Sequence, residues 1–133
     1  KIYVSFEANH RIRTFANTTS AARSFFTPNA FKRLQNNSGL EALAIAPSGE
    51  IYTLPERSGD LDRPFPLWRG TNGRLKIFAR IPRRGTHLPV GADIGPDGRF
   101  YLLERDFRGI FGFGARVRSF ALTQAGISDE IEL

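Results

Sequence analysis

The feature of this sequence that most limits its fold is an internal repeat. Three aromatic–aliphatic runs end on glutamate, and their tyrosines, Tyr3, Tyr52 and Tyr101, follow one another at intervals of 49 residues. The runs are YVSFE at 3–7, YTLPER at 52–57 and YLLER at 101–105. A fixed period of roughly 20–50 residues is the signature of solenoids, propellers and other repeat architectures. The chain is therefore expected to consist of one structural unit that recurs.

Two further motifs accompany the tyrosine runs. One alternates basic and apolar residues before Phe-Ala, in RIRTFA (11–16), RLKIFA (74–79) and RVRSFA (116–121). Strict alternation predicts a strand with one packed and one solvated face. The other leads from small and aliphatic residues through Pro-Ser-Gly or Pro-Asp-Gly into a tyrosine run, in ALAIAPSGEIY (42–52) and GADIGPDGRFY (91–101). Proline followed by Ser or Asp and then Gly is turn chemistry, so both segments are predicted to be β-hairpins.

These motifs define a repeating unit of antiparallel strands. The small-residue run is the first strand, the tyrosine run the second and the basic–apolar run the third, while FARIPRR (78–84) and LTQAGISDEIEL (122–133) are candidates for a fourth. Four strands in roughly 40–50 residues is the size of a β-propeller blade. The predicted fold is all-β, with about two and a half four-stranded antiparallel blades of a larger propeller. Residues 1–133 are expected to form one segment of a longer domain.

One short helix is expected near residues 28–35. Thr27 before Pro28 is typical of a helix N-cap followed by proline in the first turn, and AFKRL fits one or two helical turns. The segment 36–39, Asn-Asn-Ser-Gly, is expected to end the helix. Trp68 is expected to pack against a blade edge.

The composition restricts the possible sites. The chain has no cysteine, which excludes disulfides, thiolate metal sites and a cysteine nucleophile. Its formal net charge of +6 favours attraction to anions, and a solvated basic surface explains the charge equally well. No apolar run approaches the ~18–20 residues of a membrane span, and the opening KIYVSFE does not resemble a secretory signal.

Strand polarity predicts that several charged residues converge on one face of the blades. Each Pro-x-Gly turn reverses the chain, so the ends of the tyrosine strands and the starts of the small-residue strands lie at the same edge. Asp93 lies among small residues of an innermost strand and is a candidate to point into the central channel. The residues predicted to gather on the shared face are Glu7, Glu41, Glu56 and Glu104, with Arg57 and Arg105 beside two of them.

Converging carboxylates suit a hard cation such as Ca²⁺, which takes about six to eight oxygen ligands in loose geometry. A cation next to arginines would bind a phosphate ester and stabilise charge that develops on phosphoryl oxygens. The alternative is that each glutamate–arginine pair is a surface ion pair worth less than ~1 kcal/mol.

Other motifs point to no further chemistry. His10 and His87 are the only histidines and lack the spacing of a zinc site. No Gly-x-Ser-x-Gly occurs, so no serine has the context of a nucleophile elbow. GIFGFGARV at 109–117 is better explained as a hairpin loop than as a phosphate-binding loop, since no helix follows it. The arginines are spread by the repeat rather than gathered in one stripe, which argues against nucleic acid as a partner.

The motifs together resemble a known protein family. YVSFEANHRIRTF, NNSGLEALAIAPSGEIYTLPER, PVGADIGPDGRFYLLERDF and RVRSFAL are similar to the bacterial phytase-like domain, also called the esterase-like activity of phytase family. The resemblance covers nearly the whole chain and implies a β-propeller in an exported bacterial protein, periplasmic or secreted. The family name implies a phosphomonoesterase of the calcium-dependent propeller type. The positions that the resemblance carries over are Glu7, Glu41, Glu56, Asp93, Glu104 and Arg105.

The resulting hypothesis is a hydrolase of phosphoric or other esters that uses a cation-activated water, with Ca²⁺ as the expected cofactor. Its expected partners are a small anionic substrate such as a phosphate ester and the remaining blades of the parent chain, with no membrane span and no nucleic acid. The alternative is a non-catalytic propeller scaffold that binds a ligand or a protein. The assigned residues are Glu56, Glu104 and Arg105 for catalysis, Arg57 and Arg105 for substrate binding, and Glu7, Glu41 and Asp93 for the metal.

Overall fold

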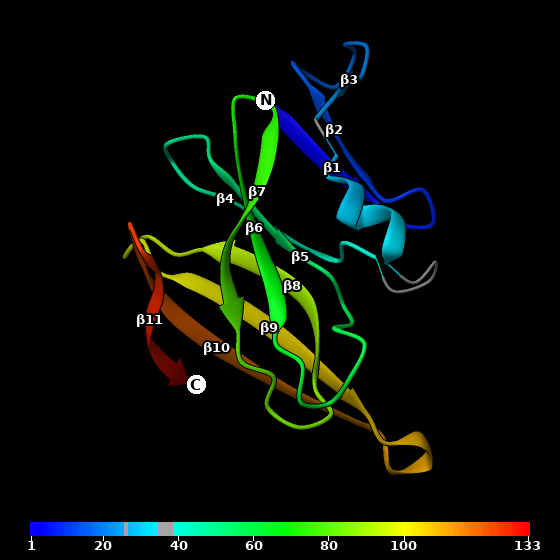
Figure 1. The fold of residues 1–133 in the computed structure, drawn as a ribbon, viewed down its shortest axis with the longest axis vertical. Coiled ribbons are helices and arrows are strands. Elements are labelled where there is room, and N and C mark those ends of the chain that lie inside the picture. Colours follow the sequence, from blue (N-terminus) through cyan, green and yellow to red (C-terminus); the bar gives the residue numbers. More distant parts are fainter. Residues whose placement is uncertain (26, 35–38) are drawn as a thin grey trace.

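The computed structural model describes residues 1–25, 27–34 and 39–133 and shows an all-β chain (Figure 1). Two short 3-10 helices, η1 (Asn29–Arg33) and η2 (Gly109–Phe111), lie in connecting segments. No helix in these ranges is long and apolar enough to cross a membrane. The strands are β1 (Ile2–Phe6), β2 (Arg11–Phe15), β3 (Arg23–Ser24), β4 (Ala42–Ile45), β5 (Ile51–Leu54), β6 (Phe65–Thr71), β7 (Arg74–Ile81), β8 (Leu88–Ile94), β9 (Phe100–Phe107), β10 (Phe113–Thr123) and β11 (Gly126–Glu132).

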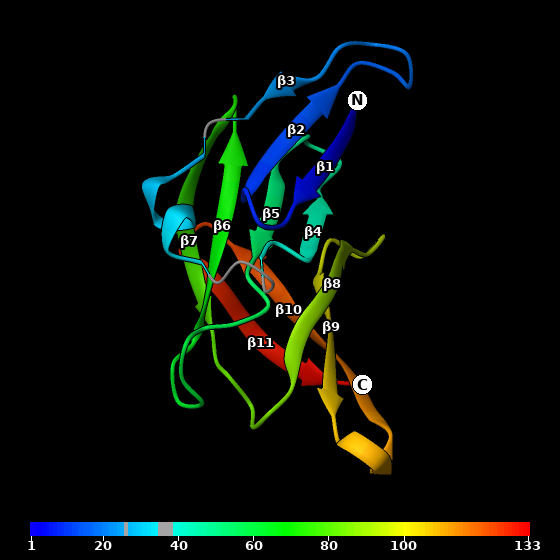
Figure 2. The ribbon, with the colours of Figure 1, turned by 90° about the vertical axis from the view of Figure 1, so that its right-hand side faces the viewer.

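The strands form three antiparallel sheets, and within each sheet neighbours in sequence are neighbours in space (Figures 1 and 2). The first sheet has the order β1-β2-β3, the second β4-β5-β6-β7 and the third β8-β9-β10-β11. This consecutive order is that of a propeller blade. The expected fold class is confirmed, because two four-stranded sheets and one smaller sheet follow each other along the chain. The described sheets do not close into a ring.

Both Pro-x-Gly segments form the predicted hairpin turns. The amide of Gly49 donates to the carbonyl of Ala46 at 2.8 Å, and the amide of Gly98 donates to the carbonyl of Gly95 at 2.9 Å. The two turn glycines have φ angles of 85° and 77°, a left-handed conformation that glycine adopts without steric cost. Turn chemistry therefore sets the β4–β5 and β8–β9 hairpins.

The prediction that RLKIFA is a third strand is wrong. The third strand of the second sheet is β6, and RLKIFA forms the first part of β7, the fourth strand. The segment 78–84, which was predicted to be a separate strand, begins inside β7. The reason is a two-residue turn at Asn72 and Gly73, whose φ angles of 49° and 80° are those of an Asn-Gly hairpin. In the third sheet the equivalent prediction is confirmed, because RVRSFA lies in the third strand, β10, and the fourth strand falls within 122–133.

The three sheets stack with apolar residues between them. Every residue of β5 is buried, because this strand lies in the middle sheet and both of its faces are covered. Tyr52 and Leu54 face the third sheet, whereas Ile51 faces the first, as the alternation of a strand requires. The core between the second and third sheets consists of Ala42, Ala44, Tyr52, Leu54, Phe65, Leu67, Ile81, Phe100, Leu102 and Phe120. The core beside the first sheet consists of Ile12, Phe25, Phe31, Leu40, Ile51, Trp68 and Leu75.

Trp68 and the helix segment differ in detail from expectation. Trp68 lies inside the second core rather than at a blade edge, and its ring meets Phe31 edge-on with centroids 4.9 Å apart. The predicted helix is present as η1, but Thr27 is not its cap, since Pro28 holds the N-cap position and the Thr27 hydroxyl donates to the carbonyl of Phe25. The predicted stop at 36–38 lies outside the described residues.

Candidate functional site

Three of the four predicted glutamates lie at adjacent strand ends. Glu7 directly follows β1, Glu41 directly precedes β4, and Glu56 follows β5 by two residues. The β4–β5 hairpin turn lies at the other end of its strands, so Glu41 and Glu56 share the edge that strand polarity predicts. Glu7, Glu41 and Glu56 are called the carboxylate cluster below.

Gly39 ties the members of the carboxylate cluster together through its backbone. Its amide donates to the Glu7 carboxylate at 3.3 Å, and its carbonyl accepts from the amide of Glu56 at 2.9 Å. These two bonds join the end of β1 to the end of β5. The backbone amide and carbonyl of Gly39 therefore connect the first and second sheets at the cluster.

Glu41 is the most perturbed carboxyl group of the cluster. Burial, the charge of Glu56 and a hydrogen bond to the Glu7 carboxylate raise the pKa of Glu41 from 4.5 to about 7, against the opposing charge of Arg105. A protonated Glu41 can donate its proton to Glu7, which is why this hydrogen bond favours the neutral form. The cluster therefore exchanges a proton near neutral pH in a partly buried environment.

Two arginines lie near the cluster. Arg105 acts on Glu41 through its charge, and its side chain is exposed on β9. The Nε of Arg57 lies 3.9 Å from the Glu56 carboxylate, and the Arg57 side chain is 52% exposed, whereas that of Glu56 is 9% exposed. Both guanidinium groups are therefore accessible to an anion next to a buried carboxylate.

Glu104 does not join the cluster but lies in a buried ion network. Its carboxylate is fully buried and accepts hydrogen bonds from Arg116 at 2.7 Å and from Arg118 at 2.7 and 2.8 Å. Arg118 also donates to Glu130 at 2.8 Å and to the carbonyl of Pro82 at 2.9 Å. All of the carboxylate's short contacts are thus to arginines.

Repeat position and strand length together explain why Glu56 and Glu104 differ, since Glu56 comes four residues after Tyr52 and Glu104 three residues after Tyr101. β5 ends at Leu54, and Pro55 follows, so Glu56 lies beyond the sheet. β9 continues to Phe107, so Glu104 remains inside the sheet, directly opposite Arg116. Because side chains alternate along a strand, Arg105 points away from this network.

Asp93 lies at the wrong end of its strand to meet Glu7 and Glu41. It pairs with Tyr101 near the β8–β9 turn, whereas Glu41 precedes the first residue of β4. Its exposed side chain accepts a hydrogen bond from the amide of Ile94 at 2.8 Å. Within residues 1–25, 27–34 and 39–133, no three His, Cys, Asp or Glu side chains are arranged so that they could hold a metal ion. The expected Ca²⁺ site is therefore not preformed there.

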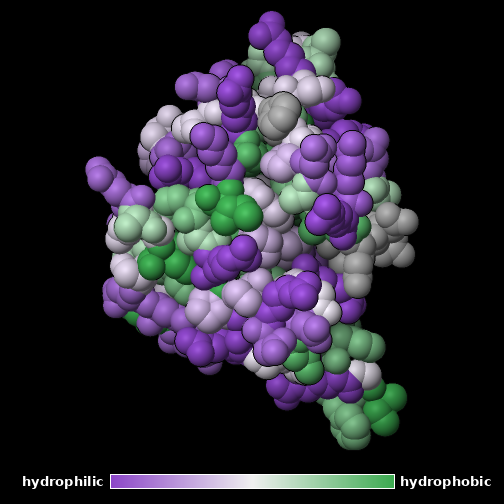
Figure 3. All heavy atoms as spheres, viewed as in Figure 1, coloured by the Kyte–Doolittle hydropathy of each residue, from purple (hydrophilic) through white to green (hydrophobic). Residues whose placement is uncertain are grey.

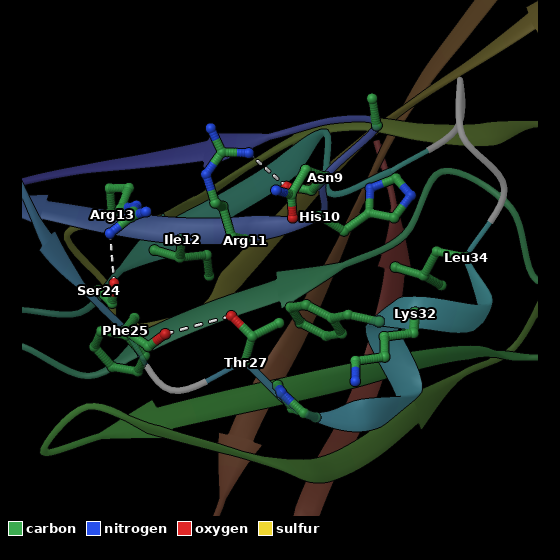
Figure 4. A pocket seen from close by; sticks show the side chains of 13 residues that line it. Asn9, His10, Arg11, Ile12, Arg13, Ser24, Phe25, Thr27, Lys32 and Leu34 are labelled. Atoms are coloured by element: carbon green, nitrogen blue, oxygen red, sulfur yellow. Dashed lines mark hydrogen bonds between the residues drawn. The ribbon is translucent and has the colours of Figure 1, made fainter.

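A pocket of about 560 Å³ begins one residue after Glu7, between β2, η1 and the segment around Phe25 (Figure 4). His10 lies on its wall with only 7% of its surface exposed, and neither ring nitrogen has a hydrogen-bond partner among the described residues. The ring packs on Gly39, where a Cβ atom would lie 2.4 Å from Nδ1. His10 lacks the sequence spacing of a zinc ligand, and no local signal in the sequence marks its burial.

The basic residues of this pocket, Arg11, Arg13 and Lys32, give its surroundings a positive charge. The Arg11 guanidinium lies over the Phe6 ring at 4.3 Å and donates to the carbonyl of Asn9 at 2.7 Å, and Arg13 donates to the Ser24 hydroxyl. An acidic site and a basic pocket therefore flank the same turn, residues 7–10.

Comparison with known proteins identifies the family to which this chain is similar. The chain matches the Phytase-like family, described as esterase-like activity of phytase, over residues 1–132. Comparisons with curated proteins and with solved structures found no significant match. The match covers nearly all of the chain and agrees with the blade-like sheets. The chain therefore belongs to the Phytase-like family.

Proposed function

We propose that this protein hydrolyses phosphate or related esters with the help of a divalent cation at the carboxylate cluster. The observation that most supports this function is the convergence of Glu7, Glu41 and Glu56 near Arg105 in a chain of the Phytase-like family. The family also supports a small anionic substrate and an exported bacterial protein, periplasmic or secreted.

The carboxylates of the cluster are the donor type that a hard cation prefers, but among the described residues they are not arranged to hold one in this structure. Burial and two neighbouring carboxylates oppose the ionisation of Glu41 and raise its pKa to about 7. A cation would relieve the same repulsion, and carboxylate oxygens are the ligands that Ca²⁺ prefers. We assign its binding to Glu7 and Glu41, with Ca²⁺ as the cofactor. A bound cation would lower the pKa of a water molecule and offset charge on phosphoryl oxygens.

The remaining residues receive roles from their positions. Glu56 is the buried member of the cluster and accepts the proton of the attacking water. The water oxygen bonds to the ester phosphorus as the bond to the alcohol oxygen breaks, and the leaving oxygen takes up the proton from Glu56, so that the alcohol departs. Arg105 and Arg57 are exposed and bind the anionic oxygens of the substrate.

Glu104 acts as a positioning residue in this proposal. Its carboxylate is engaged by Arg116 and Arg118, so it holds β9 against β10 and thereby fixes the strand that carries Arg105. Asp93 has no role in the reaction, because it lies at the hairpin end of β8.

The experiment combines cation binding with turnover in the full-length protein. Calcium is titrated by calorimetry, and hydrolysis of phytate, 4-nitrophenyl phosphate and 4-nitrophenyl acetate is measured for the wild type, Glu41→Gln and Arg105→Gln. Glu50→Gln is the control, because Glu50 lies at the hairpin end of the same sheet. We expect Glu41→Gln to lose cation binding and turnover, Arg105→Gln to lose turnover alone, and Glu50→Gln to keep both.

A scaffold without catalysis is the second candidate, and the lack of a preformed metal site in the described ranges favours it. In that case the basic pocket around His10 would hold a ligand without chemistry. Calcium binding without hydrolysis of any of the three esters would favour the scaffold. Hydrolysis that survives both Glu41→Gln and Arg105→Gln would exclude the proposed reaction centre.

A further inference from the structure

The β9–β10 hairpin carries an exposed apolar tip that the proposed reaction does not use. Ile110 and Phe111 in η2 are 95% and 86% exposed, and Phe107 and Phe113 at the adjoining strand ends are each 68% exposed. The hairpin projects away from the three sheets in both ribbon views (Figures 1 and 2). The space-filling view shows the tip as a green protrusion at the lower right (Figure 3).

Neighbouring strands do not cover this tip. β8 pairs with β9 only as far as Arg105, and β11 pairs with β10 only from Arg118 onward. Beyond Arg105 on β9, and beyond Val117 on β10, whose carbonyl accepts from the amide of Leu133, the strand pairing joins β9 and β10 to each other and ends at Phe107 opposite Phe113. An isolated two-stranded extension is marginally stable in water, and exposed clusters of large apolar side chains usually mark an interaction site.

The backbone of the tip closes its own hydrogen bonds. The amide of Phe111 donates to the carbonyl of Arg108 at 3.2 Å, that of Gly112 to Gly109 at 3.2 Å, and that of Arg108 to Gly112 at 2.9 Å. Gly109 and Gly112 have φ angles of 60° and 93°, which allow this tight turn. These three internal bonds lower the cost of moving the turn out of water, because the groups that make them need no solvent partner.

Basic side chains form a collar behind the apolar tip. The Arg105 guanidinium lies 5.8 Å from the centre of the Phe113 ring, and the rings of Phe107 and Phe113 are 5.2 Å apart. Arg108 is 57% exposed and pairs with Asp106 at 2.9 Å. The whole chain has a formal net charge of +6. Aromatic residues at the front and arginines behind them match the boundary between acyl chains and charged headgroups.

We propose that the β9–β10 tip inserts into the surface of a membrane that contains anionic lipids. Ile110 and Phe111 enter the acyl boundary first, and Phe107 and Phe113 follow at headgroup depth. Arg108 then lies among the phosphate groups, where attraction to anionic lipid adds to apolar burial. A lipid surface fits better than a protein partner because the tip projects from the sheets and places basic side chains behind its apolar residues, as an anionic headgroup layer requires (Figures 1 and 2).

Vesicle co-sedimentation tests this proposal with the full-length protein. Vesicles of phosphatidylcholine alone are compared with vesicles that also contain phosphatidylglycerol, at low and high salt. The test variant is Ile110→Ser with Phe111→Ser, and the matched control is Leu61→Ser, because Leu61 is also 60% exposed but lies in the β5–β6 loop. Arg108→Gln tests the collar. Circular dichroism checks that each variant retains the wild-type fold.

We expect the wild type and Leu61→Ser to bind anionic vesicles equally. The double variant should bind at least about tenfold more weakly, because binding grows with the apolar area that leaves water. Arg108→Gln should weaken binding to anionic vesicles and not to neutral ones. Equal binding by the wild type and the double variant would overturn the proposal. The proposal would also be overturned if the wild type bound no vesicle, for example because gel filtration showed that the tip mediates self-association instead.

Discussion

The carboxylate of Glu104 and the guanidinium of Arg118 lie 2.7 Å apart with both side chains fully buried. Burial lowers the pKa of Arg118, but its hydrogen bonds to Glu104 and Glu130 outweigh this effect, so the net shift is upward. Arg118 therefore stays charged at every accessible pH. The pair links β9 to β10 inside the third sheet and, through the carbonyl of Pro82, to the end of the second.

The first prediction concerns this ion pair. Glu104→Gln should destabilise the protein by about 3–5 kcal/mol, because it leaves Arg118 buried without its main counter-charge. Urea unfolding followed by circular dichroism measures the change. Glu132→Gln is the control: its carboxylate is 61% exposed and lies 3.7 Å from Arg116, so its loss should cost less than about 1 kcal/mol. Equal effects of the two substitutions would contradict the structural role of Glu104.

The second prediction concerns the pH dependence of stability. The folded-state pKa of Glu41 is about 7, above its ordinary value of 4.5, so between these values the folded protein holds a proton that the unfolded chain releases. Stability should therefore fall as the pH rises through this window, by about 1–2 kcal/mol for a partly solvated group. Glu41→Gln should remove this slope, as measured by urea unfolding without divalent cations. If the pH dependence of stability persists in Glu41→Gln and disappears in Glu50→Gln, its assignment to Glu41 is wrong.

The third prediction concerns the contact between Gly39 and His10. A Cβ atom at residue 39 would lie 2.4 and 2.6 Å from ring atoms of His10 and 3.3 Å from the Cα of Glu7. Because the ring is buried, Gly39→Ala should cost about 1–3 kcal/mol. Gly91→Ala is the matched control, since its nearest neighbour is at an ordinary 3.7 Å. Thermal unfolding compares the two, and an unchanged midpoint for Gly39→Ala would show that the ring moves freely.

The fourth prediction concerns His10 itself. Its ring is buried and both nitrogens lack partners among the described residues, so His10→Phe keeps a planar aromatic ring, slightly larger than the imidazole, and removes two unpaired polar atoms. This variant should be as stable as the wild type or more stable by up to about 1 kcal/mol. His10→Ala, which leaves a cavity, should lose about 2–4 kcal/mol. A clear loss of stability in His10→Phe would show that the imidazole nitrogens have a partner.

The sequence was sufficient to predict those features of the structure that depend on neighbouring residues alone. Pro-Ser-Gly and Pro-Asp-Gly set the two hairpins because glycine alone adopts their left-handed φ angles at no cost. Alternation of apolar residues located most strands, and strand polarity then brought Glu41 and Glu56 to one edge. Asn72-Gly73 is likewise a sequence signal for a hairpin turn. Because the prediction took no account of this turn, it placed RLKIFA in the third strand instead of the fourth.

Only the tertiary structure decided which charged residues remain available for function. Glu56 and Glu104 each close a tyrosine run, but Glu56 lies beyond the end of β5, while Glu104 comes one position earlier in the repeat and stays within the longer β9. Arginines from β10 then enclose Glu104, whereas Gly39 and the end of β1 leave Glu56 beside Glu41. Burial and the charges of neighbouring strands control this outcome. Both arise from contacts between residues far apart in the chain, which a local pattern does not encode.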